Sequence, residues 1–140
     1  MKKAIAVILS LLLVLASLSA VAETATLPAV VPAESVDAFV GEWEMVGVVV
    51  SGIFFDNASY AKMAGLSATP EMELTIRTNN LTLKSGGSNA TADISMKADG
   101  TLSVGDSSGS GYIDLREDGT IFFWFDSNEG SSYVVVFGKK

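Results

Sequence analysis

Apolar and polar residues alternate along most of the chain after residue 40, with the period of two that is typical of β-strands. The first such segment, Glu42–Val50, begins with apolar residues between glutamates and ends in consecutive valines. This pattern predicts a strand whose second half is buried on both sides. The residues expected to share its core face are Trp43, Met45, Gly47 and Val49.

Shorter segments continue the alternation toward the C-terminus, and each predicts one more strand. Pairs such as Asp99-Gly100 and Asp118-Gly119 lie between them. Asn, Asp and Gly supply the positive φ values of tight hairpin turns, so we expect neighbouring strands to be antiparallel. The residues expected to point inward are Met72, Leu74, Ile76, Leu81, Leu83, Ala92, Ile94, Met96, Leu102, Val104, Ile113, Leu115, Ile121, Phe123, Phe125, Tyr133, Val135 and Phe137.

One segment, Asp56–Leu66, breaks this period. It has a capping residue at Asp56, helix-forming Ala, Lys and Met residues, and Gly65 as a C-terminal stop. A short helix is therefore expected between the first two strands. Because closing a sheet removes its exposed edges, the elements together predict a mainly β fold, a small antiparallel up-and-down β-barrel of about eight strands.

The N-terminus has the pattern of a secretory signal peptide. Lys2 and Lys3 precede the apolar run Ala4–Leu18, and Ala20-Val21-Ala22 is a small-x-small cleavage site. We interpret residues 1–22 as a signal that is cleaved after Ala22, with export from a bacterium as the expected route. The alternative is an uncleaved membrane anchor, but the run is shorter than the roughly 20 apolar residues that span a bilayer.

Residues 23–35 contain Pro28 and Pro32 and follow neither period. They predict an extended linker, since proline keeps preceding residues out of the helical region. The barrel domain is expected over residues 36–140.

Composition removes several kinds of chemistry. The chain has 140 residues and no His or Cys, so thiolate nucleophiles, cysteine zinc sites and histidine bases are excluded. Without the predicted signal, 118 residues remain, with 7 Lys and Arg against 16 Asp and Glu and a net charge of −9. This balance disfavours nucleic acid and anionic membranes. We predict no enzyme activity, no metal, no cofactor, and no membrane insertion after cleavage.

Two pairs of carboxylates share a strand face, Glu42 with Glu44 and Glu71 with Glu73. Residues two apart on a strand lie about 7 Å from each other, within the range of glycosidase carboxyl pairs. The same spacing is typical of any acidic strand that faces solvent, and this is the interpretation we favour.

The segment Ile121–Phe125 alternates large apolar side chains on both faces. Ile121, Phe123 and Phe125 would face the core, while Phe122 and Trp124 point away from it. These two residues predict either an apolar ligand or partner surface, or a strand that is buried on both sides.

The sequence Phe39-Val40-Gly41-Glu42-Trp43 places a G-x-W motif at the head of the first strand. With a long helical first connection and repeated x-D-G-T hairpins, it resembles small secreted lipocalin-like domains of bacteria, which have calycin-type barrels. The resemblance covers about Val36 to Phe137. It implies that Gly41 and Trp43 are structural, with Trp43 packed across the closed end of the barrel, and it implies no catalytic residue. In that family an arginine near the C-terminus covers this tryptophan. It has no clear match here, since Arg116 is two strands early and Lys139 and Lys140 follow the last expected strand.

Two functions follow from these observations. The first is a secreted, non-enzymatic binding protein that holds a small apolar or amphipathic molecule in the barrel mouth. The alternative is an extracellular or envelope interaction module, an inhibitor or adhesion partner, with a filled core and an exposed aromatic patch. The candidate ligand-binding residues are Tyr60 and Met63 on the helix and Phe122 and Trp124 on the aromatic strand.

Overall fold

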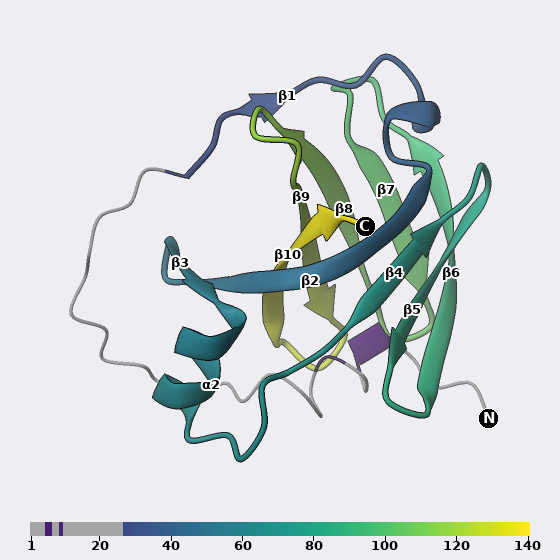
Figure 1. Cartoon of the computed structure of the whole chain (residues 1–140). Helices are drawn as coiled ribbons and strands as arrows, with labels where there is room; N and C mark the ends of the chain where they lie inside the picture. Colours follow the sequence, from purple (N-terminus) through teal and green to yellow (C-terminus); the bar gives the residue numbers. More distant parts are fainter. Residues whose placement is uncertain (1–4, 7–8, 10–26) are drawn as a thin grey trace.

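The computed structural model describes Ile5, Ala6, Leu9 and residues 27–140 (Figure 1). The other residues of the predicted signal peptide, its cleavage site and the first residues of the predicted linker lie outside the described residues. The elements are β1 (Val30–Val31), the 3-10 helix η1 (Val36–Ala38), β2 (Gly41–Val50), β3 (Ile53–Asp56), α2 (Asn57–Ala64), β4 (Glu73–Ile76), β5 (Asn80–Ser85), β6 (Ser88–Met96), β7 (Leu102–Asp106), β8 (Gly109–Arg116), β9 (Ile121–Ser127) and β10 (Ser132–Lys139).

Eight antiparallel strands form a closed barrel, which confirms the predicted fold class. Their order is β8-β7-β6-β5-β4-β2-β10-β9, and pairing of β9 with β8 closes the ring. The one long connection between the first two barrel strands, β2 and β4, contains β3 and α2 (Figure 1). No helix among the described residues is long and apolar enough to cross a membrane.

Local sequence signals account for the helix α2. Asp56 is its N-cap and accepts a hydrogen bond from the Ser59 amide at 2.7 Å, while Gly65 ends it with a φ of 69°. Hydrogen bonds from Ser59 lower the pKa of Asp56, because they stabilise its charged form. The predicted helix is thus confirmed with both of its ends.

The hairpin turns repeat one geometry. Gly100, Gly119 and Gly130 have φ values of 85°, 86° and 89°, which suit glycine after a type I turn. In the two x-D-G-T turns, Asp99 and Asp118 each accept hydrogen bonds from the amide and hydroxyl of the following threonine. These side-chain hydrogen bonds stabilise the tight turns that the sequence predicts at both positions.

The inward residues expected from the alternation of β4 to β10 form the barrel core. All of them are buried except Met96 and Leu115, which are partly buried and pack against the core. In β2 the expectation is wrong beyond Met45, because the register with β10 shifts between Val136 and Phe137. The shift turns Val48 inward and leaves Val49 with the outer residues.

Two short strands lie outside the barrel ring and were not expected. β1, from the predicted linker, pairs with the end of β8, and β3 pairs with the second half of β2. The described part of the predicted linker therefore lies against the barrel, where Ala33 also donates to the carbonyl of Gly100.

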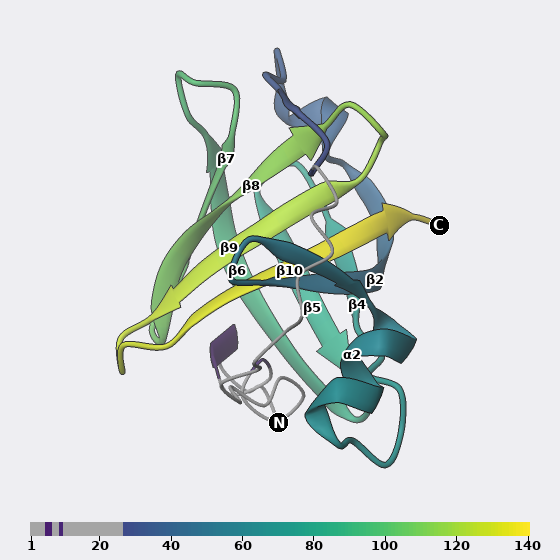
Figure 2. The ribbon, with the colours of Figure 1, turned by 90° about the vertical axis from the view of Figure 1, so that its left-hand side faces the viewer.

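The two ends of the barrel differ. One end carries η1 and β1, and the other carries α2 and the hairpins that join β5 to β6, β7 to β8 and β9 to β10 (Figures 1 and 2). Ile5 and Ala6 lie at this second end, where the Ile5 amide donates to Asp106 and Ala6 lines a hollow together with Asn128.

Candidate functional site

The end with η1 is closed by aromatic side chains. Phe39 and Trp43 are both buried, and the Trp43 indole Nε1 donates to the Phe39 carbonyl at 2.8 Å. Lys139, which lies directly opposite Trp43 on β10, places its ammonium 4.7 Å from the centre of the indole ring. A lysine therefore covers the tryptophan by a cation–π contact.

Gly41 is required at this end for two reasons. Its φ of 142° is a conformation that side-chain-bearing residues rarely adopt, and a Cβ atom there would overlap the Lys139 ammonium. The same ammonium donates to the Val40 carbonyl at 2.8 Å, so moving it away would break this hydrogen bond.

Gly41→Ala is therefore expected to lower the free energy of unfolding by about 1–3 kcal/mol, through backbone strain and displacement of Lys139. Urea unfolding followed by tryptophan fluorescence measures this change. The control is Gly87→Ala, because Gly87 has open space around its Cβ position and no positive φ. Equal stability of the two variants would show that Gly41 is not required.

The opposite end of the barrel is covered by residues from the far N-terminus. Ile5 and Leu9 are 0% exposed and belong to the same core cluster as the inward residues of the barrel. The Ile5 amide donates to Asp106 Oδ2 at 3.0 Å, and the Ala6 amide donates to Ser108 Oγ at 3.2 Å. Two aliphatic side chains and two amides thus dock on the β7–β8 hairpin end.

A hollow of about 280 Å³ adjoins these N-terminal residues. Its lining comes from the β7–β8 and β9–β10 hairpins together with Ala6, and Tyr133 is its one aromatic residue. The lining residues are Ala6, Ser107, Ser108, Ser127, Asn128, Glu129, Ser131 and Tyr133. We call this end, with Ile5, Leu9 and the hollow, the open end, because removal of the predicted signal peptide would uncover it.

The two candidate residues on the helix differ in exposure. Tyr60 is buried in the barrel core cluster, whereas Met63 is 39% exposed. Tyr60 thus belongs to the core and Met63 to the surface, and their part in ligand binding stays a prediction.

Phe122 and Trp124 lie on the outside of the barrel, away from Tyr60. Phe122 is 1% exposed and packs in an outer cluster with Val49 and Val136. β9 is thus buried on both sides at Phe122. The alternative expectation, that Phe122 belongs to an exposed aromatic patch, is wrong. Trp124 is partly buried and stacks on Tyr112, with ring centroids 5.7 Å apart. The four candidate residues do not form one site.

Sequence reasoning missed a buried ion pair on this outer face. Arg116 Nε lies 2.6 Å from Asp114 Oδ1, and Arg116 Nη2 donates to Asp114 Oδ2 at 3.0 Å. The Trp124 indole donates to Asp114 Oδ2 at 2.9 Å, and the guanidinium lies 4.0 Å from the centre of the Phe122 ring. Arg116 Nη1 also donates to the Pro28 carbonyl at 2.7 Å, so the pair fastens the N-terminal strap Leu27–Ala33 to the barrel.

The sequence contains a weak signal of this pair. Asp114 and Arg116 are two apart on β8, so they share a strand face. Arg116 also contacts the strap, which lies far from it along the chain and which the sequence alone does not place.

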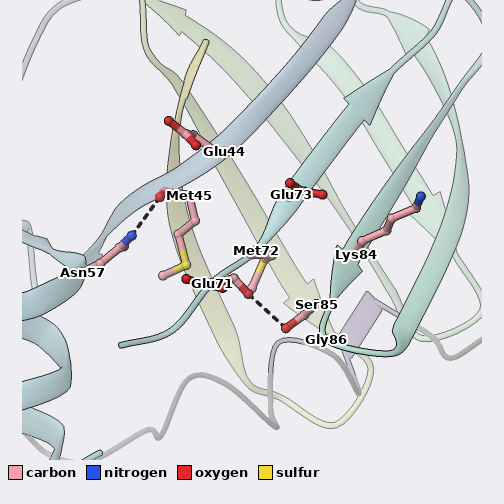
Figure 3. A pocket seen from close by; sticks show the side chains of 9 residues that line it. All are labelled: Glu44, Met45, Asn57, Glu71, Met72, Glu73, Lys84, Ser85 and Gly86. Atoms are coloured by element: carbon pink, nitrogen blue, oxygen red, sulfur yellow. Dashed lines mark hydrogen bonds between the residues drawn. The ribbon is translucent and has the colours of Figure 1, made fainter. Parts of the chain in front are cut away.

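A polar groove of about 670 Å³ lies between α2, β2, β4 and the end of β5 (Figure 3). It contains three of the carboxylates considered above, Glu44, Glu71 and Glu73. Lys140 Nζ lies 2.6 Å from Glu73 Oε1 and lowers the pKa of this carboxyl. Glu73 therefore remains ionised, whereas a glycosidase acid must hold a proton.

The remaining contacts in the groove are structural. Asn57 Nδ2 donates to the Met45 carbonyl at 2.8 Å, and Ser85 Oγ donates to the Glu71 carbonyl at 3.0 Å (Figure 3). Across the part of the chain that the structure describes, no three Asp or Glu side chains converge as metal ligands would.

Comparison of the chain with models of protein families, with curated proteins and with solved structures finds no match.

Proposed function

We propose that the mature protein is a secreted, non-enzymatic binding protein, a lipocalin-like barrel that holds the apolar part of a small amphipathic molecule at its open end. The observation that supports this proposal is the complete burial of Ile5 and Leu9 in the barrel's own core cluster. Both residues belong to the predicted signal peptide, so the mature barrel lacks them. The interior thus accommodates aliphatic groups that its own domain does not supply.

The energetic argument concerns the apolar surface that cleavage uncovers. Burying one aliphatic side chain is worth about 1.5–3 kcal/mol, so loss of Ile5 and Leu9 removes about 3–6 kcal/mol of apolar burial. A ligand with an aliphatic chain restores this burial. Phe125 and Tyr133, paired next to the β9–β10 turn, lie at the end where that chain enters.

The closed end also favours entry of the ligand at the open end. Phe39 and Trp43 are buried there, and Lys139 covers the indole ring. One closed end and one apolar open end are the arrangement of a one-mouthed binding barrel.

The test is native mass spectrometry of the protein recovered after export of the full chain from a bacterial host. We expect a reproducible mass excess that disappears on unfolding. The exported protein should also bind N-phenyl-1-naphthylamine, an apolar dye that brightens in apolar surroundings. Absence of both the mass excess and dye binding would contradict the proposal.

A charged residue at the mouth gives the matched variants. Tyr133→Asp should weaken dye binding by about tenfold or more, because an unpaired carboxylate at an apolar site is costly. The control is Tyr112→Asp, since Tyr112 stacks on Trp124 outside the barrel. Equal dye affinity of the two folded variants would place the binding site elsewhere.

One observation favours the alternative, an extracellular interaction module. A hollow of about 140 Å³ on the outer face is lined largely by apolar residues, among them Leu27, Phe54 and Phe122. A protein partner captured by the exported wild type and lost in Phe54→Ser, without any dye binding, would support this function instead.

A further inference from the structure

The open end carries hydrogen-bond acceptors as well as an apolar interior. Asp106 Oδ2 accepts from the Ile5 amide, and Ser108 Oγ accepts from the Ala6 amide. Both donors belong to the predicted signal peptide. In the mature protein, neither acceptor retains this partner.

The geometry of Asp106 is set by its own turn. Its Oδ1 accepts from the Ser108 amide at 2.8 Å and from the Ser108 hydroxyl at 2.6 Å. These bonds hold the carboxylate in one orientation, so Oδ2 remains directed at the position of the Ile5 amide. An acceptor held in place in this way loses little freedom when a ligand binds.

The hollow beside this acceptor is acidic. Among the described residues that line it, Glu129 is charged and none is Lys or Arg. A carboxylate head at this position would meet Asp106 and Glu129 without a cation to compensate the repulsion. A head that donates N–H groups would replace the bonds that Ile5 and Ala6 make.

Resting on the proposed function, we infer that the ligand of the open end combines an aliphatic chain with a polar head that donates N–H hydrogen bonds to Asp106 Oδ2 and Ser108 Oγ. The chain takes the place of the Ile5 and Leu9 side chains, and the head takes the place of the two backbone amides. Acyl amides and alkyl amines fit this description, and fatty carboxylates do not.

The test compares three single-chain probes with the same tail, namely dodecanamide, dodecylamine and dodecanoate. Each displaces N-phenyl-1-naphthylamine from the exported protein at pH 7, below its micelle concentration. We expect the amide and the amine to bind about tenfold more tightly than the carboxylate, the effect of one hydrogen bond to a charged group plus the absence of repulsion. Raising the salt concentration should reduce the preference for the amine more than that for the amide, because salt screens charge.

Asp106→Asn tests the assigned acceptor. The variant keeps an Oδ1 acceptor for Ser108 but removes the negative charge, so dodecylamine should bind several-fold more weakly and dodecanoate more tightly. The matched control is Asp118→Asn. Asp118 accepts the same pair of bonds from Thr120, at 3.0 Å and 2.6 Å, in a turn at the opposite end of the barrel.

The outcomes separate this inference from the function on which it rests. If the dye binds and the three probes displace it equally, or dodecanoate binds most tightly, the inference about the head is overturned and the binding function stands. The same holds if Asp106→Asn and Asp118→Asn have equal probe preferences. If neither the dye nor any probe binds, the proposed function itself fails.

Discussion

Replacing Arg116 with methionine is expected to lower the free energy of unfolding by about 3–5 kcal/mol, because it leaves the Asp114 carboxylate buried without its partner. The Asp114 side chain is 4% exposed, and its two oxygens hold both Arg116 and the Trp124 indole. Arg116→Met also removes the bond to the Pro28 carbonyl, so the strap Leu27–Ala33 loses one of its hydrogen bonds to the barrel. Urea unfolding of the exported protein measures the free energy.

Two further variants show that the cause is the unpaired charge. The double variant Asp114→Leu with Arg116→Met removes both charges and should recover most of the lost stability, because no buried charge remains. Lys140→Met breaks the exposed pair with Glu73, whose side chains are 35% and 56% exposed, and should cost at most about 1 kcal/mol. Arg116→Met as stable as Lys140→Met would contradict the expected result.

The second large effect is expected at the closed end. Trp43→Ala should lower the free energy of unfolding by about 3–5 kcal/mol, the usual cost of truncating a large aromatic side chain in a core. Trp43 is 2% exposed, and its loss also leaves the Phe39 carbonyl without the indole donor. Lys139 loses the ring that its ammonium covers. Urea unfolding followed by circular dichroism measures the change, since Trp124 is the one tryptophan left to report by fluorescence.

Trp43→Phe is the matched control. It keeps an aromatic ring over the closed end and removes the indole N–H. We therefore expect the free energy of unfolding to fall by only about 1–2 kcal/mol. Dye binding at the open end should survive in Trp43→Ala wherever the variant is folded. A variant that unfolds at the urea concentration of the wild type would show that Trp43 does not close the barrel.

Local patterns were enough to predict the barrel and much of its core. The alternation in β4 to β10 follows from the pleat of a strand, in which successive side chains point to opposite faces. The turns at Gly100 and Gly119 and the ends of α2 depend on residues within four positions of one another, so a short window of sequence contains their cause. The closed ring followed from the series of hairpins, since antiparallel neighbours leave few other ways to cover both edges.

The candidate site was predicted less well, because it depends on contacts between distant parts of the chain. Periodicity places Phe122 on the outer face of β9, but only the strap and β3 decide that this face is buried. Helical spacing groups Tyr60 with Met63, while the packing of α2 against the barrel separates them. Neither Asp106 nor Ser108 belongs to a sequence motif that would identify it as a binding residue.

By itself the sequence determined the strands, the hairpin turns, the helix and the acidic, histidine-free and cysteine-free chemistry, because each depends on composition or on neighbours along the chain. Only the tertiary structure decided the shifted register at Val136, the buried pair of Asp114 with Arg116, the lysine over Trp43 and the burial of Ile5 and Leu9 at the open end. Ile5 and Asp106 are 101 residues apart, and their contact exists only once the barrel has brought its hairpins to one end. Burial and pairing are properties of the whole packed molecule, and no local pattern encodes them.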